Sequence, residues 1–178
     1  MTLPKNTEHV VRRITVTDEQ ALINAAKESR TKNLSELLIL AIETAMRRGE
    51  LLALEWDDID LERYELFVRR SKNGKSRTIP LTPRAHKTLL SMADNNSGLL
   101  FPLSANAVRL AFDRIRKRVG LKHLRFHDLR HEAISRLFEA GLTYPEVIAV
   151  SGHKTASALF KYAKANNLFI YNRLQKIS

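Results

Sequence analysis

The chain has 178 residues, a length that allows one domain with a buried core and little more. Its 30 Lys and Arg residues outnumber 19 Asp and Glu residues, and the formal net charge of +11 favours a polyanionic partner, with nucleic acid before an anionic membrane surface. The absence of cysteine excludes disulfides, thiolate nucleophiles and cysteine-ligated metal centres.

No stretch of the sequence has the features of a membrane anchor. The longest apolar run, residues 37–42, is far shorter than the ~20 residues that a helix needs to cross a bilayer. Residues 1–8 lack the apolar segment of a secretory signal. We therefore expect no membrane association and residence in the cytoplasm.

The first third of the chain is predicted to be a tail followed by two helices. Residues 1–13 are polar and basic without an apolar period, so we expect a tail or the remnant of a linker there, with the compact part starting at residue 14. Thr17 or Asp18 is placed to cap the first helix. Asn33 is placed to cap the second, which is apolar on nearly all sides over residues 34–46 and is predicted to lie in the core.

A β-hairpin is predicted next. Residues 64–68 and 77–81 have strand character and flank the pair Asn73-Gly74, a strong hairpin signal, which places Lys72 near the tip. The fold is therefore predicted to be mixed, mainly α with a small antiparallel β-sheet or hairpin. The rest of the chain is predicted to be helical at roughly residues 83–93, 104–119, 127–140, 143–150 and 154–164, with a C-terminal tail from about 165.

Basic residues gather in two places. Some lie off the apolar stripe of the predicted helix 104–119 and others lie on the hairpin. Such clusters are as common on solvated faces as at phosphates, and the overall positive charge favours phosphate contact. The residues concerned are Arg109, Arg116 and Lys117 on the helix, and Arg69, Arg70, Lys72, Lys75 and Arg77 on the hairpin.

Five separated residues suggest phosphoryl transfer on DNA. They are Arg47, His127, Arg130, His153 and Tyr162. Two arginines can hold the non-bridging oxygens of a phosphodiester through bidentate contacts. Histidines can donate to it or move protons, and a tyrosine hydroxyl can attack phosphorus.

The sequence around these residues resembles the tyrosine recombinase or phage integrase family, specifically its C-terminal catalytic domain, over about residues 14–165. The segment Ala45-Met46-Arg47-Arg48-Gly49-Glu50-Leu51 matches the context of the family's first catalytic arginine, so the resemblance assigns that role to Arg47 and not to Arg48. The other matches are the hairpin lysine in Lys72-Asn73-Gly74, the His-x-x-Arg box His127-Asp128-Leu129-Arg130, the pair Gly152-His153, and the nucleophile Tyr162.

The chain differs from the family pattern in two residues and in length. Ala45 replaces a frequent glycine and Ser151 a frequent leucine, and neither is expected to touch a functional atom. The length leaves no room for the N-terminal core-binding domain that such recombinases usually carry. The resemblance implies tetramers on paired sites of double-stranded DNA for a full-length protein, and we expect a monomer for this chain alone.

Attack by the Tyr162 oxygen on a backbone phosphate would give a crowded, negatively charged transition state. Arg47 and Arg130 would neutralise its equatorial oxygens. The energy of the broken bond would be kept in a 3′-phosphotyrosyl link. Strand joining would therefore need no metal and no nucleotide cofactor.

Three further residues are predicted to handle protons and hydrogen bonds in this reaction. A tyrosine with a pKa of about 10 is mostly protonated at neutral pH, so His127 is a candidate base for its proton. Lys72 is the candidate donor to the leaving 5′ oxygen. His153 would donate a hydrogen bond to a non-bridging oxygen.

Several neighbouring residues invite other assignments. His127 and His131 have metal-ligand spacing, but Arg130 lies between them and no further ligand follows, so His131 is predicted to be a supporting or core residue. Glu50 is expected to pair with Arg47 or with the backbone. Tyr171 is the fallback nucleophile.

Two alternative functions stay open. A type IB topoisomerase-like enzyme shares the tyrosine, arginines and histidine, although the short interval from His153 to Tyr162 and the compact hairpin motif favour a recombinase. A catalytically silent DNA-binding module would keep the charge and the fold. The presence of all six candidate residues argues against that module.

Overall fold

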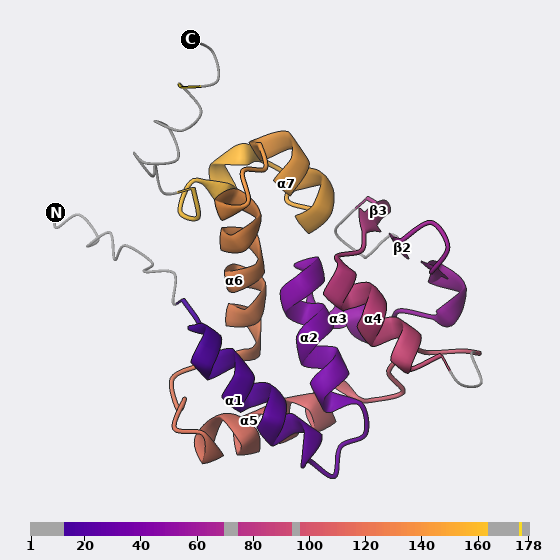
Figure 1. Ribbon diagram of the computed structural model, residues 1–178, viewed down its shortest axis with the longest axis vertical. Helices are drawn as coiled ribbons and strands as arrows, with labels where there is room; N and C mark the ends of the chain where they lie inside the picture. Colours follow the sequence, from indigo (N-terminus) through magenta and orange to yellow (C-terminus); the bar gives the residue numbers. More distant parts are fainter. Residues whose placement is uncertain (1–12, 70–74, 94–96, 164–174, 176–178) are drawn as a thin grey trace, which may run out of the picture.

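The computed structural model describes residues 13–69, 75–93, 97–163 and 175 (Figure 1). The chain folds mainly into helices with one small antiparallel sheet, which confirms the predicted fold class. In chain order the elements are α1 (Val16–Lys27), α2 (Leu34–Thr44), α3 (Arg48–Leu52), the 3₁₀ helix η1 (Trp56–Asp58), β1 (Ile59–Asp60), β2 (Glu65–Val68), β3 (Arg77–Pro80), α4 (Pro83–Ser91), α5 (Ala105–Arg118), α6 (Phe126–Glu139), α7 (Tyr144–Ser151) and the 3₁₀ helix η2 (Ala156–Leu159).

Helix α2 is the centre of the hydrophobic core. It packs against α1, α4 and α6, and Figure 1 shows it in the middle of the molecule. Leu37 and Leu40 are completely buried, because the helix carries apolar residues on nearly all sides. The prediction that this segment lies in the core is confirmed. Across the described part of the chain, no helix combines the length and the apolar character needed to cross a membrane.

The starts of the first two helices differ in part from the prediction. Helix α1 is capped by Thr15, whose hydroxyl accepts from the backbone N–H of Asp18 while the Asp18 carboxylate accepts from the N–H of Thr15. The cap therefore lies ahead of the two predicted candidates. Asn33 is the N-cap residue of α2, as predicted, but its backbone is left-handed with φ of 57° and its side chain makes no cap hydrogen bond.

The end of α2 is set by a left-handed residue. The helix stops at Thr44 and not at residue 46, because Ala45 adopts φ of 52°. An alanine in this conformation carries a steric cost that glycine avoids. The break turns the chain so that Arg47 precedes α3 as its N-cap residue.

The sheet has the strand order β1-β2-β3, and all its pairs are antiparallel. Leu66 pairs with Ile79, and both are fully buried on the core face, which confirms the predicted hairpin strands. Strand β1 was not predicted, because two residues among turn formers give no alternating pattern. Lys72 lies outside the described residues.

Beyond α7 the chain is less helical than the sequence predicted. A helix was predicted over residues 154–164, but only η2 forms, and the chain is irregular from there to residue 163. Gly152 ends α7 in a left-handed conformation with φ of 68°. Figure 1 shows α7 lying across the end of α6, and α7 packs against both α6 and β3.

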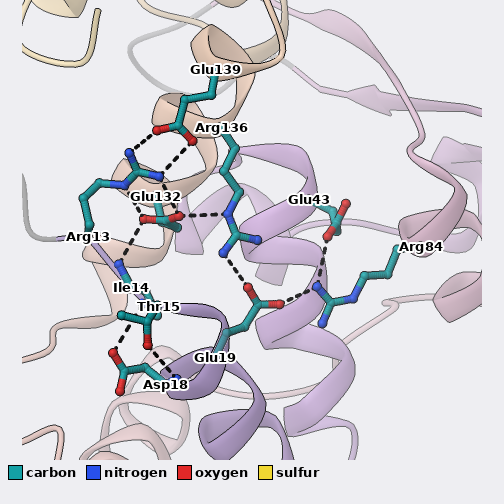
Figure 2. Close-up of polar contacts among 10 residues, drawn as sticks. All are labelled: Arg13, Ile14, Thr15, Asp18, Glu19, Glu43, Arg84, Glu132, Arg136 and Glu139. Atoms are coloured by element: carbon teal, nitrogen blue, oxygen red, sulfur yellow. Dashed lines mark hydrogen bonds and ion pairs between the residues drawn. The ribbon is translucent and has the colours of Figure 1, made fainter. Parts of the chain in front are cut away.

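A network of ion pairs joins the start of the described chain to α6 (Figure 2). Arg13 donates to the carboxylates of Glu132 and Glu139, so this residue of the expected tail is held on the helix. The Glu132 carboxylate, only 2% exposed, also accepts from the backbone N–H of Ile14 at 3.0 Å and from Arg136 Nε at 2.8 Å. Arg136 also pairs with Glu19 of α1, which extends the network to the other helices. Glu19 pairs with Arg84 of α4, and Arg84 pairs with Glu43 of α2.

Removal of the Glu132 carboxylate tests how far this network stabilises the fold. We expect Glu132→Ala to lower the free energy of unfolding by about 3 kcal/mol, because it leaves the buried N–H of Ile14 without an acceptor and breaks the pairs with Arg13 and Arg136. Glu139→Ala removes an acceptor of Arg13 whose side chain is 57% exposed, and should cost about 1 kcal/mol or less. Urea denaturation of both variants measures the difference. Equal losses would show that burial of the network adds nothing.

Candidate active site

The site forms where the α2–α3 break, α6 and the end of α7 meet. Arg47 precedes α3, Arg130 lies on α6, His153 follows α7 and Tyr162 follows η2. Arg47 Nη2 donates to the Gly152 carbonyl at 3.4 Å, and the rings of His153 and Tyr162 are 6.5 Å apart between centroids. The structure therefore brings together residues that lie more than 100 positions apart in the sequence.

Glu50 is the carboxylate around which two arginines are arranged. It accepts from the backbone N–H and from Nη1 of Arg47, each at 2.9 Å, which confirms the predicted pairing. Arg77 donates to the same carboxylate through Nη1 at 3.1 Å and Nη2 at 2.9 Å. Burial acts to raise the pKa of Glu50, but the hydrogen bonds and charges of Arg77 and Arg47 outweigh it and lower the pKa to about 2.

Arg77 is a part of this site that sequence reasoning missed. It was predicted only as one of several hairpin cations able to contact phosphate, yet its side chain is 11% exposed and paired with Glu50. Its Nε also donates to the Val150 carbonyl at 2.8 Å, which ties β3 to α7. A Cβ at Gly152 would lie 2.8 Å from Arg77 Nη1 and would have to displace that guanidinium, and the positive φ of Gly152 also favours glycine.

Arg130 is buried, with 4% of the residue exposed, and is held by backbone carbonyls. Its Nη2 donates to the Ser151 carbonyl at 2.8 Å, and its Nη1 donates to the Ala45 carbonyl. Burial, followed by the charge of Arg47, lowers its pKa to about 10, so the guanidinium is still protonated at neutral pH. Carbonyl oxygens fix its orientation without cancelling its charge, which leaves a desolvated cation suited to binding an anion.

Tyr162 and two histidines form the other side of the site. Tyr162 is 6% exposed, and its hydroxyl is hydrogen-bonded to His131 Nδ1. Burial raises the pKa of Tyr162 to about 12, against the opposing charge of Arg130. The ring of His127 packs edge-on against His131, with centroids 4.6 Å apart, and burial lowers the pKa of both histidines. His131 therefore contacts the candidate nucleophile, which its sequence position alone did not reveal.

Ser151 contacts a candidate site residue, contrary to the expectation from the sequence. It was expected to touch no functional atom, but its buried Oγ lies 2.7 Å from His153 Nδ1. The same Oγ donates to the Val147 carbonyl at 2.6 Å. Burial, with the charges of Arg130 and Arg47, lowers the pKa of His153 to about 4, so this imidazole is neutral at neutral pH.

A groove lined by basic residues adjoins His127. Helix α5 buries one apolar stripe, as predicted, and Arg109 and Arg116 of this helix line the groove together with Arg48 and Arg125. Asp113, which pairs with Arg116, also lines it, so the four arginines leave the groove with an excess of positive charge. Among the residues that the structure describes, no cluster of three or more His, Asp or Glu side chains is arranged to hold a metal ion.

Sequence comparisons show the family to which this chain belongs. Residues 12–168 match the model of the phage integrase family. The chain is 42% identical over 162 residues to the shufflon-specific DNA recombinase of Escherichia coli, covering 89% of this chain and 41% of that protein. It is 31% identical over 145 residues to tyrosine recombinase XerC of Corynebacterium glutamicum, covering 75% of this chain and 47% of that protein. The chain spans less than half the length of these relatives.

Solved structures of tyrosine recombinase catalytic domains share the fold. The catalytic domain of bacteriophage HP1 integrase superposes with a TM-score of 0.70 and 20% identity, covering 85% of this chain and 86% of that one. The Tn1549 transposon integrase, solved with transposon right end DNA, superposes with a TM-score of 0.75 and 18% identity, covering 98% of this chain and 68% of that one. A lambda integrase dimer bound to a core site superposes with a TM-score of 0.70 and 26% identity, covering 85% of this chain and 47% of that one. The fold is that of tyrosine recombinase catalytic domains, and the chain belongs to the phage integrase family.

Neutralising Glu50 tests whether it stabilises the paired arginines. Glu50→Gln is expected to lower the free energy of unfolding at pH 7 by about 3 kcal/mol, since the pKa falls from 4.5 to about 2 and each unit is worth ~1.4 kcal/mol. Because the folded-state pKa is the lower one, this stabilisation is complete above pH 4.5 and is lost as the pH falls toward 2. The gap between variant and unmodified chain should therefore shrink with acid.

Urea denaturation at pH 7 and at pH 2.5 measures that gap. Glu62→Gln, on the exposed surface before β2, is the matched control and should leave the unfolding free energy unchanged within about 0.5 kcal/mol at both pH values. A gap of the same size at both pH values would show that Glu50 does not act through its charge.

Proposed function

We propose that this chain is the catalytic domain of a site-specific DNA recombinase, an integrase that cuts and rejoins DNA strands through a 3′-phosphotyrosyl intermediate. The observation that carries the proposal is the buried guanidinium of Arg130, held by carbonyls and not by a carboxylate, on the same side of the fold as Tyr162. A desolvated cation beside a tyrosine hydroxyl suits a reaction in which negative charge develops on phosphate.

The two catalytic arginines have complementary environments. Arg130 is buried, whereas the Arg47 side chain is 43% exposed and is accessible to a bound phosphate. Together they can contact both non-bridging oxygens of a phosphodiester. Glu50 holds Arg47 by its backbone and side chain, so the position of Arg47 is set before DNA binds.

His153 and Lys72 complete the proposed chemistry. His153 lies by Arg130 and Arg47 and would contact a non-bridging oxygen; a bound phosphate would raise its pKa and so favour the protonated, donating form. Lys72 would protonate the leaving 5′ oxygen, a role that rests on the sequence. Charge stabilisation by arginines and proton transfer by side chains leave no step that needs a metal or a nucleotide cofactor.

The DNA would follow the basic groove beside His127. The groove is lined by Arg48, Arg109, Arg116 and Arg125, and the net charge of +11 favours a polyanion. The transposon and lambda integrases that share the fold were solved with DNA, which supports the same partner here. We further propose tetramers on paired sites for a full-length recombinase, a monomer for this chain alone, and action in the cytoplasm.

Covalent capture of DNA tests the proposed function. The chain is incubated with a pool of nicked duplexes of randomised core sequence, whose cleavage releases a short strand and traps any protein–DNA adduct. We expect a denaturant-resistant adduct with the unmodified chain and none with Tyr162→Phe, because that change removes the attacking oxygen. DNA affinity should change by less than about twofold, since one hydroxyl contributes little beside many phosphate contacts.

Tyr64→Phe is the matched control for this experiment. Tyr64 is 54% exposed and lies beside β2, away from the site, so its variant should form as much adduct as the unmodified chain. An adduct with Tyr162→Phe would show that another residue is the nucleophile. Salt-sensitive DNA binding with no adduct from any variant would instead identify a silent DNA-binding module.

A further inference from the structure

The Tyr162 hydroxyl has a specific partner that the sequence did not assign to the reaction. The tyrosine ring packs in a cluster of buried apolar residues, and its hydroxyl is hydrogen-bonded to His131 Nδ1. The rings of Tyr162 and His131 are 5.4 Å apart between centroids and inclined by 30°. The other buried members of the cluster are Ala45, Ala133, Ile134, Val147 and Leu159.

We infer that His131 is the group that accepts the Tyr162 proton during strand cleavage, and that His127 supports His131 from its other side. The sequence suggested His127 as this base, but in the structure the ring that reaches the hydroxyl is that of His131. The inference rests on the proposed function and assigns one step within it.

The step balances as a concerted displacement. The Tyr162 O–H bond breaks toward His131 Nδ1 while the tyrosine oxygen forms its bond to phosphorus. The bond from phosphorus to the 5′ oxygen breaks, and its electron pair leaves on that oxygen, which takes a proton from a separate donor. In rejoining, the imidazolium of His131 returns its proton to the departing tyrosine oxygen.

The resting protonation states suit this role. Burial raises the pKa of Tyr162 to about 12 and lowers that of His131 to about 4, so at neutral pH the hydroxyl keeps its proton and the imidazole is free to accept one. Both shifts favour keeping the proton on Tyr162 in the resting protein. Transfer becomes favourable only as the oxygen bonds to phosphorus, because that bond makes the oxygen far less basic.

The charged and titratable groups around His131 come from three parts of the chain. On and just before α6 they are His127, Asp128 and Arg125; after α7 there is His153, and after η2 there are Lys161 and Tyr162. When Nδ1 of the neutral His131 ring accepts the hydrogen bond from Tyr162, the single N–H of that ring is on Nε2. The neighbouring cations oppose a second proton at rest, and an incoming phosphate would offset them and raise the pKa of His131.

A kinetic comparison of two substrates tests the inference. Single-turnover adduct formation is measured with a nicked duplex captured by the unmodified chain, and with the same duplex carrying a 5′-bridging phosphorothiolate, whose sulfur leaves without a proton. We expect His131→Gln to slow the reaction about 100-fold or more on both substrates, because a better leaving group cannot replace a lost base. His127→Ala should slow it less than His131→Gln does.

Added imidazole separates base catalysis from a purely structural role. With His131→Ala, which opens space beside Tyr162, millimolar imidazole should restore part of the lost rate, and more at pH 8 than at pH 6 because only neutral imidazole accepts a proton. Thermal unfolding of each variant checks that it is folded. The same imidazole should not restore Tyr162→Phe, which lacks the proton donor.

Three outcomes would overturn the inference while leaving the proposed function intact. An undiminished or faster reaction of His131→Gln would show that the hydrogen bond only restrains the tyrosine. Recovery of His131→Gln on the phosphorothiolate would make His131 the acid for the leaving group. Failure of imidazole to restore a folded His131→Ala would make it a structural residue. Absence of adduct with the unmodified chain would instead overturn the proposed function.

Discussion

The structure of the site depends on how Arg130 is buried. Its guanidinium is desolvated, yet its ligands are the carbonyls of Ala45 and Ser151, which leave its charge uncancelled. Those two carbonyls are available because α2 ends at a left-handed residue and α7 ends at Gly152. The helix ends thus supply the oxygens that a buried cation requires, and in the proposed function this cation binds the DNA phosphate.

Glu50 organises the rest of the positive charge around Arg130. One buried carboxylate pairs with both Arg47 and Arg77, so the three arginines together carry more charge than it can neutralise. Arg77 also bonds the end of α7, which places the hairpin, the α2–α3 break and the Gly152 turn in one unit. Rigid positioning of several cations before a substrate binds is the arrangement that lowers the cost of charge development in phosphoryl transfer.

Local patterns predicted most helices and the hairpin, because their apolar periods and turn residues lie within a few positions of each other. Motif spacing also selected Arg47, Arg130 and Tyr162, which the structure brings close together, and their catalytic roles stay predictions. Other contacts could not be read in this way. Arg77 meets Glu50 across 27 positions and Tyr162 meets His131 across 31, and such pairings depend on how the helices pack. The helix predicted over residues 154–164 was wrong, since only Ala156–Leu159 becomes helical, as a short 3₁₀ helix after the Gly152 turn.

In the proposed reaction, the hydroxyl oxygen of Tyr162 forms a covalent link to a DNA phosphate beside Arg130. The most direct test is tandem mass spectrometry of the protein–DNA adduct after digestion with protease and nuclease. We expect a nucleotide attached through a 3′ phosphate to the peptide that contains Tyr162. A nucleotide on a peptide containing Tyr144 or Tyr171, or on a serine, would contradict it.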